Sequence, residues 1–277
     1  MTFTTTVAAP SIRHAVDLIW DWRVEPGDFQ LERILPQPGS GLIINLLDDE
    51  TRVYSDDAAQ RCERSPGCVF SGQFTHSFVI DSTEQIAVMG VIFPPGGATS
   101  LLREPMDRLA SRHTALEDLV GPSGRALRQR LLNTPTATAR LDVLQTWLRA
   151  HCTSTVVHAS VRFALGAINS APQIQRVGSV IAASGLSPRR FGTLFREQVG
   201  IGPKQYARMQ RFRAVLTHSR QGGPIEWSRI AADCGFHDQP HLVREFRQFA
   251  GMTPTAYLAL RGQNVNHVPL ARTTEKT

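Results

Sequence analysis

The C-terminal part of this chain contains one sequence pattern twice. The run IAASGLSPRRFGTLFREQVGIGPKQY, from Ile181 to Tyr206, returns as IAADCGFHDQPHLVREFRQFAGMTPTAY, from Ile230 to Tyr257, with two extra residues at the turn of the second copy. Both copies open on Ile-Ala-Ala, and five identities follow in fixed register: Phe195 with Phe246, Arg196 with Arg247, Gly200 with Gly251, Pro203 with Pro254 and Tyr206 with Tyr257. A pattern repeated in register predicts one small folding unit built twice.

Each copy predicts a helix, a tight turn and a second helix. In the first copy, a short helix from Val177 to Ser184 leads to Gly185, which permits the turn, and Ser187 with Pro188 starts a helix that ends at Gly200. In the second copy, the same roles fall to Gly235 at the turn, Asp238 at the helix start and Gly251 at its end. The apolar positions expected to face inward are Phe191, Leu194, Phe195, Trp227, Ile230, Ala231, Cys234, Leu242, Phe246 and Phe249.

Two helices joined by a short glycine turn are the helix-turn-helix unit, whose second helix enters the major groove of DNA. Between the two units, Pro203 to His218 predicts a helix whose 16 residues span roughly 24 Å at about 1.5 Å each. A rod of that length could hold the two second helices about one DNA turn apart, near 34 Å. Basic residues on this connecting helix favour a position near phosphate: Lys204, Arg208, Arg211 and Arg213.

The charge of the chain is divided unevenly. Residues 1–154 hold 14 basic and 18 acidic side chains, a net charge of −4, whereas residues 155–277 hold 16 basic and 6 acidic side chains, a net charge of +10. The overall value of +6 therefore hides a strongly basic half that carries the repeat. This division is typical of a nucleic-acid reader joined to another module.

The N-terminal half predicts many short strands, among them 18–24, 41–47, 78–80 and 86–93, followed by helices at 124–132 and 138–151. We therefore expect an α+β protein of two domains, with a small cupin-like β-barrel and helices in 1–154, an all-α double helix-turn-helix domain in 155–262, and a flexible tail in 263–277. The helix at 138–151 has one apolar stripe, Leu141, Leu144, Trp147 and Leu148, which must pack on the barrel or on a second subunit. We predict that it forms a homodimer.

Catalytic patterns are missing from the N-terminal half. Its histidines, His14, His76, His113 and His151, are isolated, and the four cysteines form no CxxC pair, although Cys62 and Cys68 could form a thiol switch. We expect no enzyme activity, no metal and no cofactor. A barrel enzyme or a DNA-repair protein fused to a DNA-binding module stays open as the alternative. The sequence shows neither a membrane span nor a signal peptide, so we expect a cytoplasmic protein without membrane contact.

A ligand-binding role remains for the β-rich half. Small-molecule sites are mostly apolar with a few polar groups. We therefore expect the candidate effector pocket to be lined by four aromatic and three polar residues: Trp20, Trp22, Phe70 and Phe93 with Arg33, Gln73 and His76. Each of these aromatic residues, taken singly, fits a place in the core better than a place in a pocket.

The double pattern resembles the AraC/XylS family of bacterial transcriptional regulators over about residues 155–262. The resemblance is strongest in the second copy, where Gly235, Phe236, Asp238, Leu242, Arg244, Phe246, Gly251, Pro254 and Tyr257 stand at the family's signature positions. The N-terminal half is similar to poorly characterised β-rich domains that accompany this module in some members. The resemblance implies a double-stranded DNA partner, and it adds a small-molecule effector and RNA polymerase as candidate partners.

The resemblance also implies which side chains meet DNA. In this family the recognition helices read bases from their outward N-terminal positions, where Gly192 and Pro240 depart from the usual polar residues. The expected base-reading residues are Arg189, Thr193, Gln239, His241 and Arg244. The expected phosphate contacts are Arg190, Arg196, Lys204, Arg208 and Arg247. Arg244 could instead brace its own helix.

Overall fold

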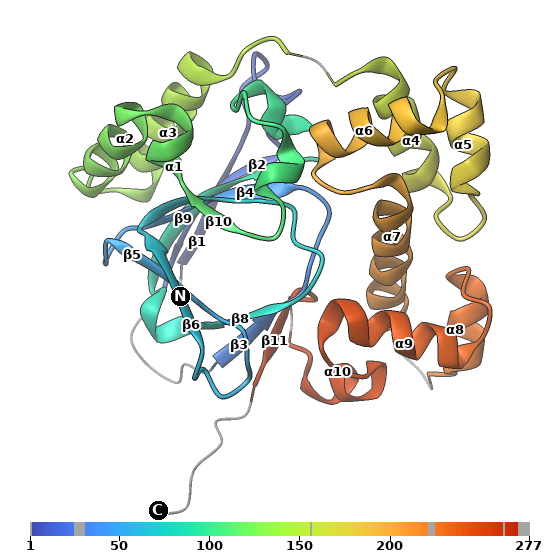
Figure 1. Ribbon diagram of the computed structural model, residues 1–277. Helices are drawn as coiled ribbons and strands as arrows, with labels where there is room; N and C mark the ends of the chain where they lie inside the picture. The colour runs from blue at the N-terminus through green and yellow to red at the C-terminus, as the bar shows by residue number, and fades with distance from the viewer. Residues whose placement is uncertain (1, 25–30, 156, 221–224, 263, 271–277) are drawn as a thin grey trace, which may run out of the picture.

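The computed structural model describes residues 2–24, 31–155, 157–220, 225–262 and 264–270. A β-rich N-terminal part stands beside an all-helical C-terminal part, in which the long helix α7 (Pro203–His218) runs between α6 and α9 (Figure 1). The predicted α+β class with two different halves is thus confirmed. The predicted boundaries at 154 and 262 stay predictions.

The N-terminal part contains two antiparallel sheets. The first has the order β1 (Thr2–Val7), β2 (Leu18–Arg23), β9 (Ala87–Phe93), β4 (Ser40–Asn45), β7 (Cys68–Ser71) and β10 (His113–Ala115). The second has the order β11 (His267–Pro269), β3 (Leu31–Ile34), β8 (Phe78–Asp81), β5 (Glu50–Tyr54) and β6 (Cys62–Pro66). Short 3₁₀ turns lie at η1 (Ser82–Glu84), η2 (Gly97–Ser100) and η3 (Met106–Leu109).

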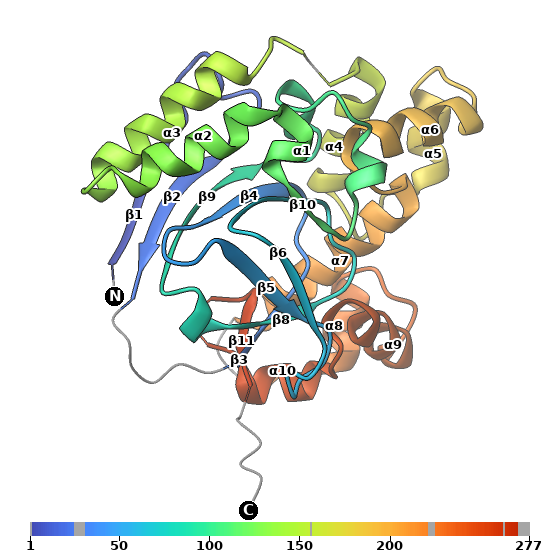
Figure 2. The ribbon, with the colours of Figure 1, turned by 60° about the vertical axis from the view of Figure 1, so that its left-hand side comes forward.

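Three helices cover the outer face of the six-stranded sheet: α1 (Leu116–Val120), α2 (Pro122–Leu132) and α3 (Ala137–His151), as Figure 2 shows. The apolar stripe of α3 packs into the core of this domain, where Leu144 and Leu148 are fully buried. A buried ion pair adds to this contact, since Arg140 Nε lies 2.7 Å from Asp21 Oδ2 on β2. The stripe therefore belongs to the inside of one subunit, and the prediction that it forms a homodimer interface is wrong.

Seven helices form the C-terminal part of the described chain: α4 (Ala159–Ser170), α5 (Val177–Ala183), α6 (Pro188–Val199), α7, α8 (Trp227–Asp233), α9 (Gln239–Ala250) and α10 (Pro254–Leu260). They enclose one aromatic core that includes Phe191, Phe195, Phe212 and Phe246. The predicted double helix-turn-helix is confirmed, with the connecting helix at its predicted residues.

The segment after α10 does not behave as the expected flexible tail. Strand β11 pairs antiparallel with β3 of the N-terminal sheet, and Val268 is completely buried. Next to it, His267 Nδ1 lies 2.8 Å from Glu32 Oε2. The tail was predicted because a short polar segment carries little pattern of its own, whereas the pairing partner lies far away at residues 31–34. Residues 271–277 lie outside the described chain.

Candidate nucleic-acid interface

The two repeat copies form two matching helix-turn-helix units. Each has a first helix of 7 residues (α5 and α8) and a second helix of 12 residues (α6 and α9). The turn glycines have nearly the same left-handed backbone, with φ of 74° at Gly185 and 76° at Gly235. Figure 1 shows α6 and α9 at opposite ends of α7. The connecting helix thus separates two similar second helices, as the sequence predicted.

Both second helices begin with a side-chain cap and end at a glycine. Ser187 Oγ accepts the N–H of Arg190, and Asp238 Oδ1 accepts the N–H of His241 at 2.7 Å. The bond from His241, followed by the one from His237, holds the pKa of Asp238 below its ordinary value, so the carboxylate stays charged at a helix start. At the other end, Gly200 and Gly251 adopt left-handed conformations that close the helices.

The two units align differently in their first and second helices. The second helices match residue by residue at one constant difference in residue number, and the five identities from Phe195 and Phe246 onward share this difference. In the first helices, however, Val180 and Ile230 are both the fourth residue and both buried. The repeated Ile-Ala-Ala is therefore shifted by one position, and the second turn contains one extra residue rather than two.

The five predicted base-reading residues lie on the first two turns of the second helices. Arg189, Gln239 and Arg244 are exposed, whereas Thr193 and His241 are half-buried. By helix position, Thr193 corresponds to Arg244, and Arg190 corresponds to His241. The two units thus present different chemical groups from equivalent places.

The side chain of His241 is held by the turn that precedes it. Its ring meets Phe236 edge-on with 5.5 Å between centroids, and its Nδ1 accepts the N–H of His237 at 3.3 Å. An imidazole that accepts through Nδ1 carries its proton on Nε2. His241 therefore offers an N–H donor.

Four of the five predicted phosphate contacts are exposed: Arg190, Arg196, Lys204 and Arg247. The fifth, Arg208, is half-buried and is engaged by other side chains of the protein. Its Nε and Nη2 donate to the two oxygens of Glu245 at 2.7 and 2.8 Å, a further hydrogen bond reaches Gln248, and its guanidinium lies over the Phe249 ring. Arg208 thus braces α7 against α9, contrary to the predicted phosphate role. Its partner was missed because Glu245 is 37 positions away.

Two basic residues on α7, Arg213 and Arg211, are absent from the predicted phosphate contacts. Of these, Arg211 packs against the second turn. Its guanidinium lies 5.8 Å from the centre of the Phe236 ring in the second turn, and its buried Nε has no hydrogen-bond partner among the described residues. Periodicity could have suggested it, since Arg208 and Arg211 lie three positions apart on one face of the helix.

The C-terminal ends of both second helices face the N-terminal domain. A Cβ atom built on Gly200 would lie 3.1 Å from Gln73 Cβ, and one built on Gly251 would lie 2.6 Å from Arg33 Nη1. Gln73 is buried, with Nε2 donating to the backbone oxygens of Gln37 and Phe74 and lying 3.5 Å from Met209 Sδ. Arg33 pairs with Asp57 and donates to Ser77 Oγ at 2.7 Å. Two of the three polar pocket candidates therefore lie at the contact between the domains.

The aromatic pocket candidates do not converge. Phe70 and Phe93 belong to the buried core beneath the helices, with ring centroids 6.2 Å apart. Side chains alternate along a strand, and Ile19 and Asp21 point toward this same core, so Trp20 and Trp22 lie on the opposite face. His76 is exposed in the loop before β8. The seven candidates are thus spread over four environments: the contact between the domains, the buried core, the opposite face of the sheet and an exposed loop.

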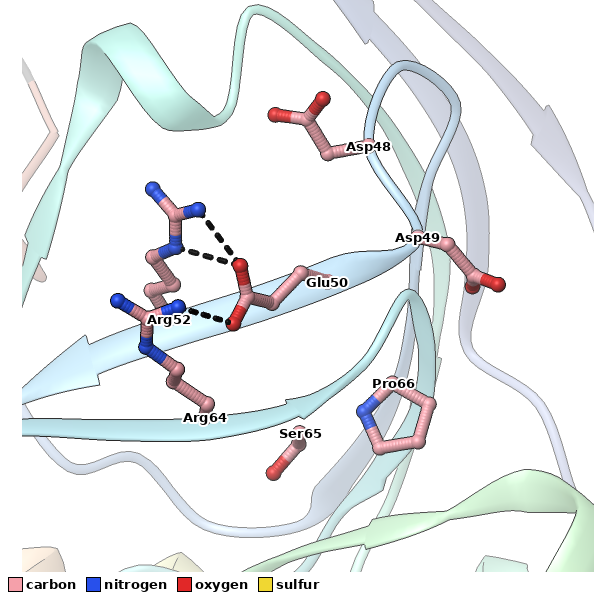
Figure 3. Close-up of a pocket in the computed structure, with 7 residues that line it drawn as sticks. All are labelled: Asp48, Asp49, Glu50, Arg52, Arg64, Ser65 and Pro66. Atoms are coloured by element: carbon pink, nitrogen blue, oxygen red, sulfur yellow. Dashed lines mark hydrogen bonds and ion pairs between the residues drawn. The ribbon is translucent and has the colours of Figure 1, made fainter.

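Two pockets at the β6 edge are lined by none of these seven residues. The first, of about 650 Å³, is lined by Asp48, Asp49, Glu50, Arg52, Arg64, Ser65 and Pro66 (Figure 3). Glu50 receives Arg52 at 2.6 Å and Arg64 at 3.2 Å, and chiefly the hydrogen bond from Arg52 keeps the pKa of Glu50 below its ordinary value. The second, of about 1030 Å³, continues past Arg64 toward α1 and α2. Both are polar, unlike the predicted pocket.

Within the described ranges, no three or more His, Cys, Asp and Glu side chains gather as metal ligands would. Over the same residues, every helix is too short or too polar to cross a lipid bilayer.

Two families match different parts of the chain. Residues 180–259 match a family described as a helix-turn-helix domain, and residues 4–115 match a domain of unknown function, DUF6597. The first match covers both helix-turn-helix units, and the second covers both sheets up to β10.

Known proteins resemble parts of this chain in sequence. The probable transcriptional regulator LumQ of Photobacterium leiognathi is 35% identical over 83 residues, which are 29% of this chain and 32% of that protein. The arabinose operon regulatory protein of Escherichia coli is 33% identical over 93 residues, which are 33% of this chain and 31% of that protein. The matched part thus spans about a third of the length of these relatives. A crystal structure of ToxT from Vibrio cholerae aligns with a TM-score of 0.44 at 10% identity, over 94% of this chain and 98% of that one.

Proposed function

Residues 180–259 form a helix-turn-helix domain of the AraC type, and from this premise we propose that the chain is a transcription regulator that binds double-stranded DNA. The observation that carries the proposal is the pair of equivalent 12-residue helices, α6 and α9, at the two ends of α7. Each presents exposed basic residues near its start. A pair of recognition helices held in this way would enter two successive major grooves on one side of the duplex.

The side chains at the helix starts suggest what each unit reads. Arg189 and Arg244 can place two donors on guanine O6 and N7, Gln239 can pair with the edge of adenine, and Thr193 can touch a thymine methyl group. His241 offers its Nε2–H to an acceptor such as guanine O6 or N7. Because Arg190 occupies the place of His241 in the first unit, we assign it to base reading as well. Arg196, Lys204 and Arg247 then supply phosphate contacts.

The N-terminal domain is proposed to regulate this reading through its contacts with the helix ends. Gln73 and Arg33 each lie against the C-terminal glycine of one recognition helix, so a movement of the loop that holds Gln73 or of strand β3 would tilt α6 or α9. A small-molecule effector bound to the β-rich domain is the proposed trigger. RNA polymerase is the proposed partner at the promoter, and the cytoplasm is the proposed location, as for a protein that must meet DNA.

Selection of DNA sites from a random pool by the full chain tests the proposal. We expect one enriched sequence that keeps its complex in a gel-shift titration when non-specific duplex is added in large excess. The double variant Arg189→Ala with Arg244→Ala should lose the preference for that sequence while keeping residual salt-sensitive binding. No enrichment, or equal affinity for all sequences, would contradict the proposal.

Regulation is tested by thermal-shift screening of small metabolites, followed by DNA titration with each metabolite that raises the melting temperature. The variant Gln73→Ala should keep the melting shift and lose the change in DNA affinity. A ligand that alters DNA affinity equally in wild type and variant would remove Gln73 from the coupling.

A further inference from the structure

Among the edge strands of the two sheets, one differs from the others in the described chain. Strands β10 and β11 have three residues each, and β6 carries Glu63, Arg64 and Pro66. Short length, charge and proline are the usual means by which an edge strand avoids pairing with another chain. Strand β1 has six residues, Thr-Phe-Thr-Thr-Thr-Val, with neither a charge nor a proline.

The free side of β1 is also exposed. Its six residues pair with β2, and the pairings described for the chain give it no second neighbour. Two of its apolar side chains stand in solvent, with 55% of Phe3 and 67% of Val7 exposed. Residues 3, 5 and 7 of a strand share one face. Phe3, Thr5 and Val7 therefore form one row beside an open line of backbone donors and acceptors.

We propose that β1 is a homodimer interface, in which the β1 strands of two copies pair antiparallel across a two-fold axis at Thr5. In this register Phe3 of each copy lies opposite Val7 of the other, and the remaining pairs join threonine to threonine. Aromatic residues beside β-branched residues, and threonine beside threonine, are favourable cross-strand pairs. The two six-stranded sheets would then continue as one.

A second copy fits this edge better than a foreign strand because the sequence complements itself. In a single register, Phe3 of each copy pairs with Val7 of the other, so the same contact forms twice, as a two-fold interface requires. The register also keeps equivalent residues on the same face, so that α3 of both copies lies on one side of the joined sheet. That side is opposite to the row of Phe3, Thr5 and Val7. Arg140 of α3 pairs with Asp21 on one face of β2, whereas Trp20 and Trp22, which lie beside Thr5 and Phe3, are on the other face.

Cysteine cross-linking tests the register. Residues directly opposite in an antiparallel pair have Cβ atoms about 5 Å apart, within reach of a disulfide, whereas diagonal neighbours are about 7 to 8 Å apart. In a Cys62→Ser background, which removes the exposed native thiol, Thr5→Cys should give a disulfide-linked dimer on mild oxidation and Thr4→Cys should not. Cross-linking at both positions alike, or at neither, overturns the proposed pairing.

Sedimentation of the full chain without DNA tests the interface in the native sequence. Wild type should show a dimer that dissociates on dilution, and Thr5→Lys should raise the dissociation constant about tenfold or more, because two like charges would face each other. Thr146→Lys on the exposed side of α3 is the matched control and should leave it unchanged. A monomeric wild type, or equal effects of the two variants, contradicts the proposal. Because no DNA is present, these outcomes are independent of the proposed DNA reading.

Discussion

Arg208 on α7 and Glu245 on the recognition helix α9 form a two-pronged ion pair, with both contacts between 2.7 and 2.8 Å. The pair joins the connecting helix to the second DNA-reading unit. The carboxylate neutralises a basic residue that the sequence alone places near phosphate. The pair adds to the contact between Phe212 of α7 and the Phe246 and Phe249 rings of α9.

The first prediction separates a brace from a phosphate contact at Arg208. Glu245→Ala would free the guanidinium, so a phosphate contact would bind DNA more tightly, whereas a brace would bind it more weakly because α9 loses its support. We expect weaker binding for both Glu245→Ala and Arg208→Ala, with a loss of about 1 kcal/mol in the free energy of unfolding for this half-exposed pair. The salt dependence of DNA binding should keep its slope in Arg208→Ala. A slope smaller by about one unit would restore the phosphate role.

The second prediction concerns Arg244, which is exposed on α9. Arg244→Ala should cost about 1 to 3 kcal/mol on the selected site and relax the base preference at one position. The neighbouring variant Arg247→Ala is the control, since a phosphate contact should weaken binding to all sequences alike and lower the salt slope. Titration of single-base variants of the site measures both. If Arg244→Ala weakened every sequence equally, its assignment to base reading would be wrong.

A third prediction compares the two turn glycines, which share nearly the same φ. A Cβ atom on Gly185 meets nothing within 4 Å, whereas one on Gly235 would lie 2.3 Å from the carbonyl oxygen of Gln173. Gly185→Ala should therefore cost about 1 kcal/mol of left-handed backbone strain, and Gly235→Ala about 3 kcal/mol or more, because backbone atoms must also move. Urea unfolding measures the two losses. Equal losses would show that the loop before α5 does not press on the second turn.

The fourth prediction follows from His113, whose pKa burial lowers to about 4. Its ring packs against Phe74 and Phe78, at 5.0 and 5.3 Å between centroids. The unfolded state takes up a proton near pH 6.5 and the folded state only near pH 4, so stability is lost as the pH falls through this window. Between pH 7.5 and 5 we expect a loss of about 2 kcal/mol, which His113→Gln should reduce. Urea unfolding midpoints of wild type and variant, measured across this pH range, compare the two losses of stability. An identical pH dependence in the variant would exclude His113 as the cause.

The fifth prediction tests the return of the C-terminal segment to the N-terminal sheet. Val268→Ala should lower the free energy of unfolding by about 2 kcal/mol, because shortening this fully buried side chain leaves a cavity. Thr255→Ala at an exposed position on α10 is the control. Identical melting of both variants and wild type would mean that the segment is free, as the sequence first suggested.

The sequence predicted local features well and long-range pairings poorly. Helix caps such as Ser187 and Asp238 and the turn glycines are encoded within a few residues, and each was found at its expected place. Arg208 and the segment around Val268 were misjudged because their partners, Glu245 and strand β3, are remote in the chain. The sequence next to Arg208 or Val268 contains no pattern that indicates such a remote partner.

The same limit applies to the pocket and the dimer surface. An aromatic residue on a strand looks alike whether it faces a core or a ligand, and the two faces of the sheet separated Trp20 from Phe70 only once the strand register was known. The stripe of α3 was correctly recognised as a packing face. The structure shows that its partner is the sheet of the same subunit.

Hydroxyl-radical footprinting of the full chain on its selected site shows whether the two recognition helices read two successive major grooves. We expect two protected blocks on one face of the duplex, about 10 to 10.5 base pairs apart, and loss of one block when about five base pairs are inserted between them. A single protected block, or a footprint unchanged by the insertion, would contradict it.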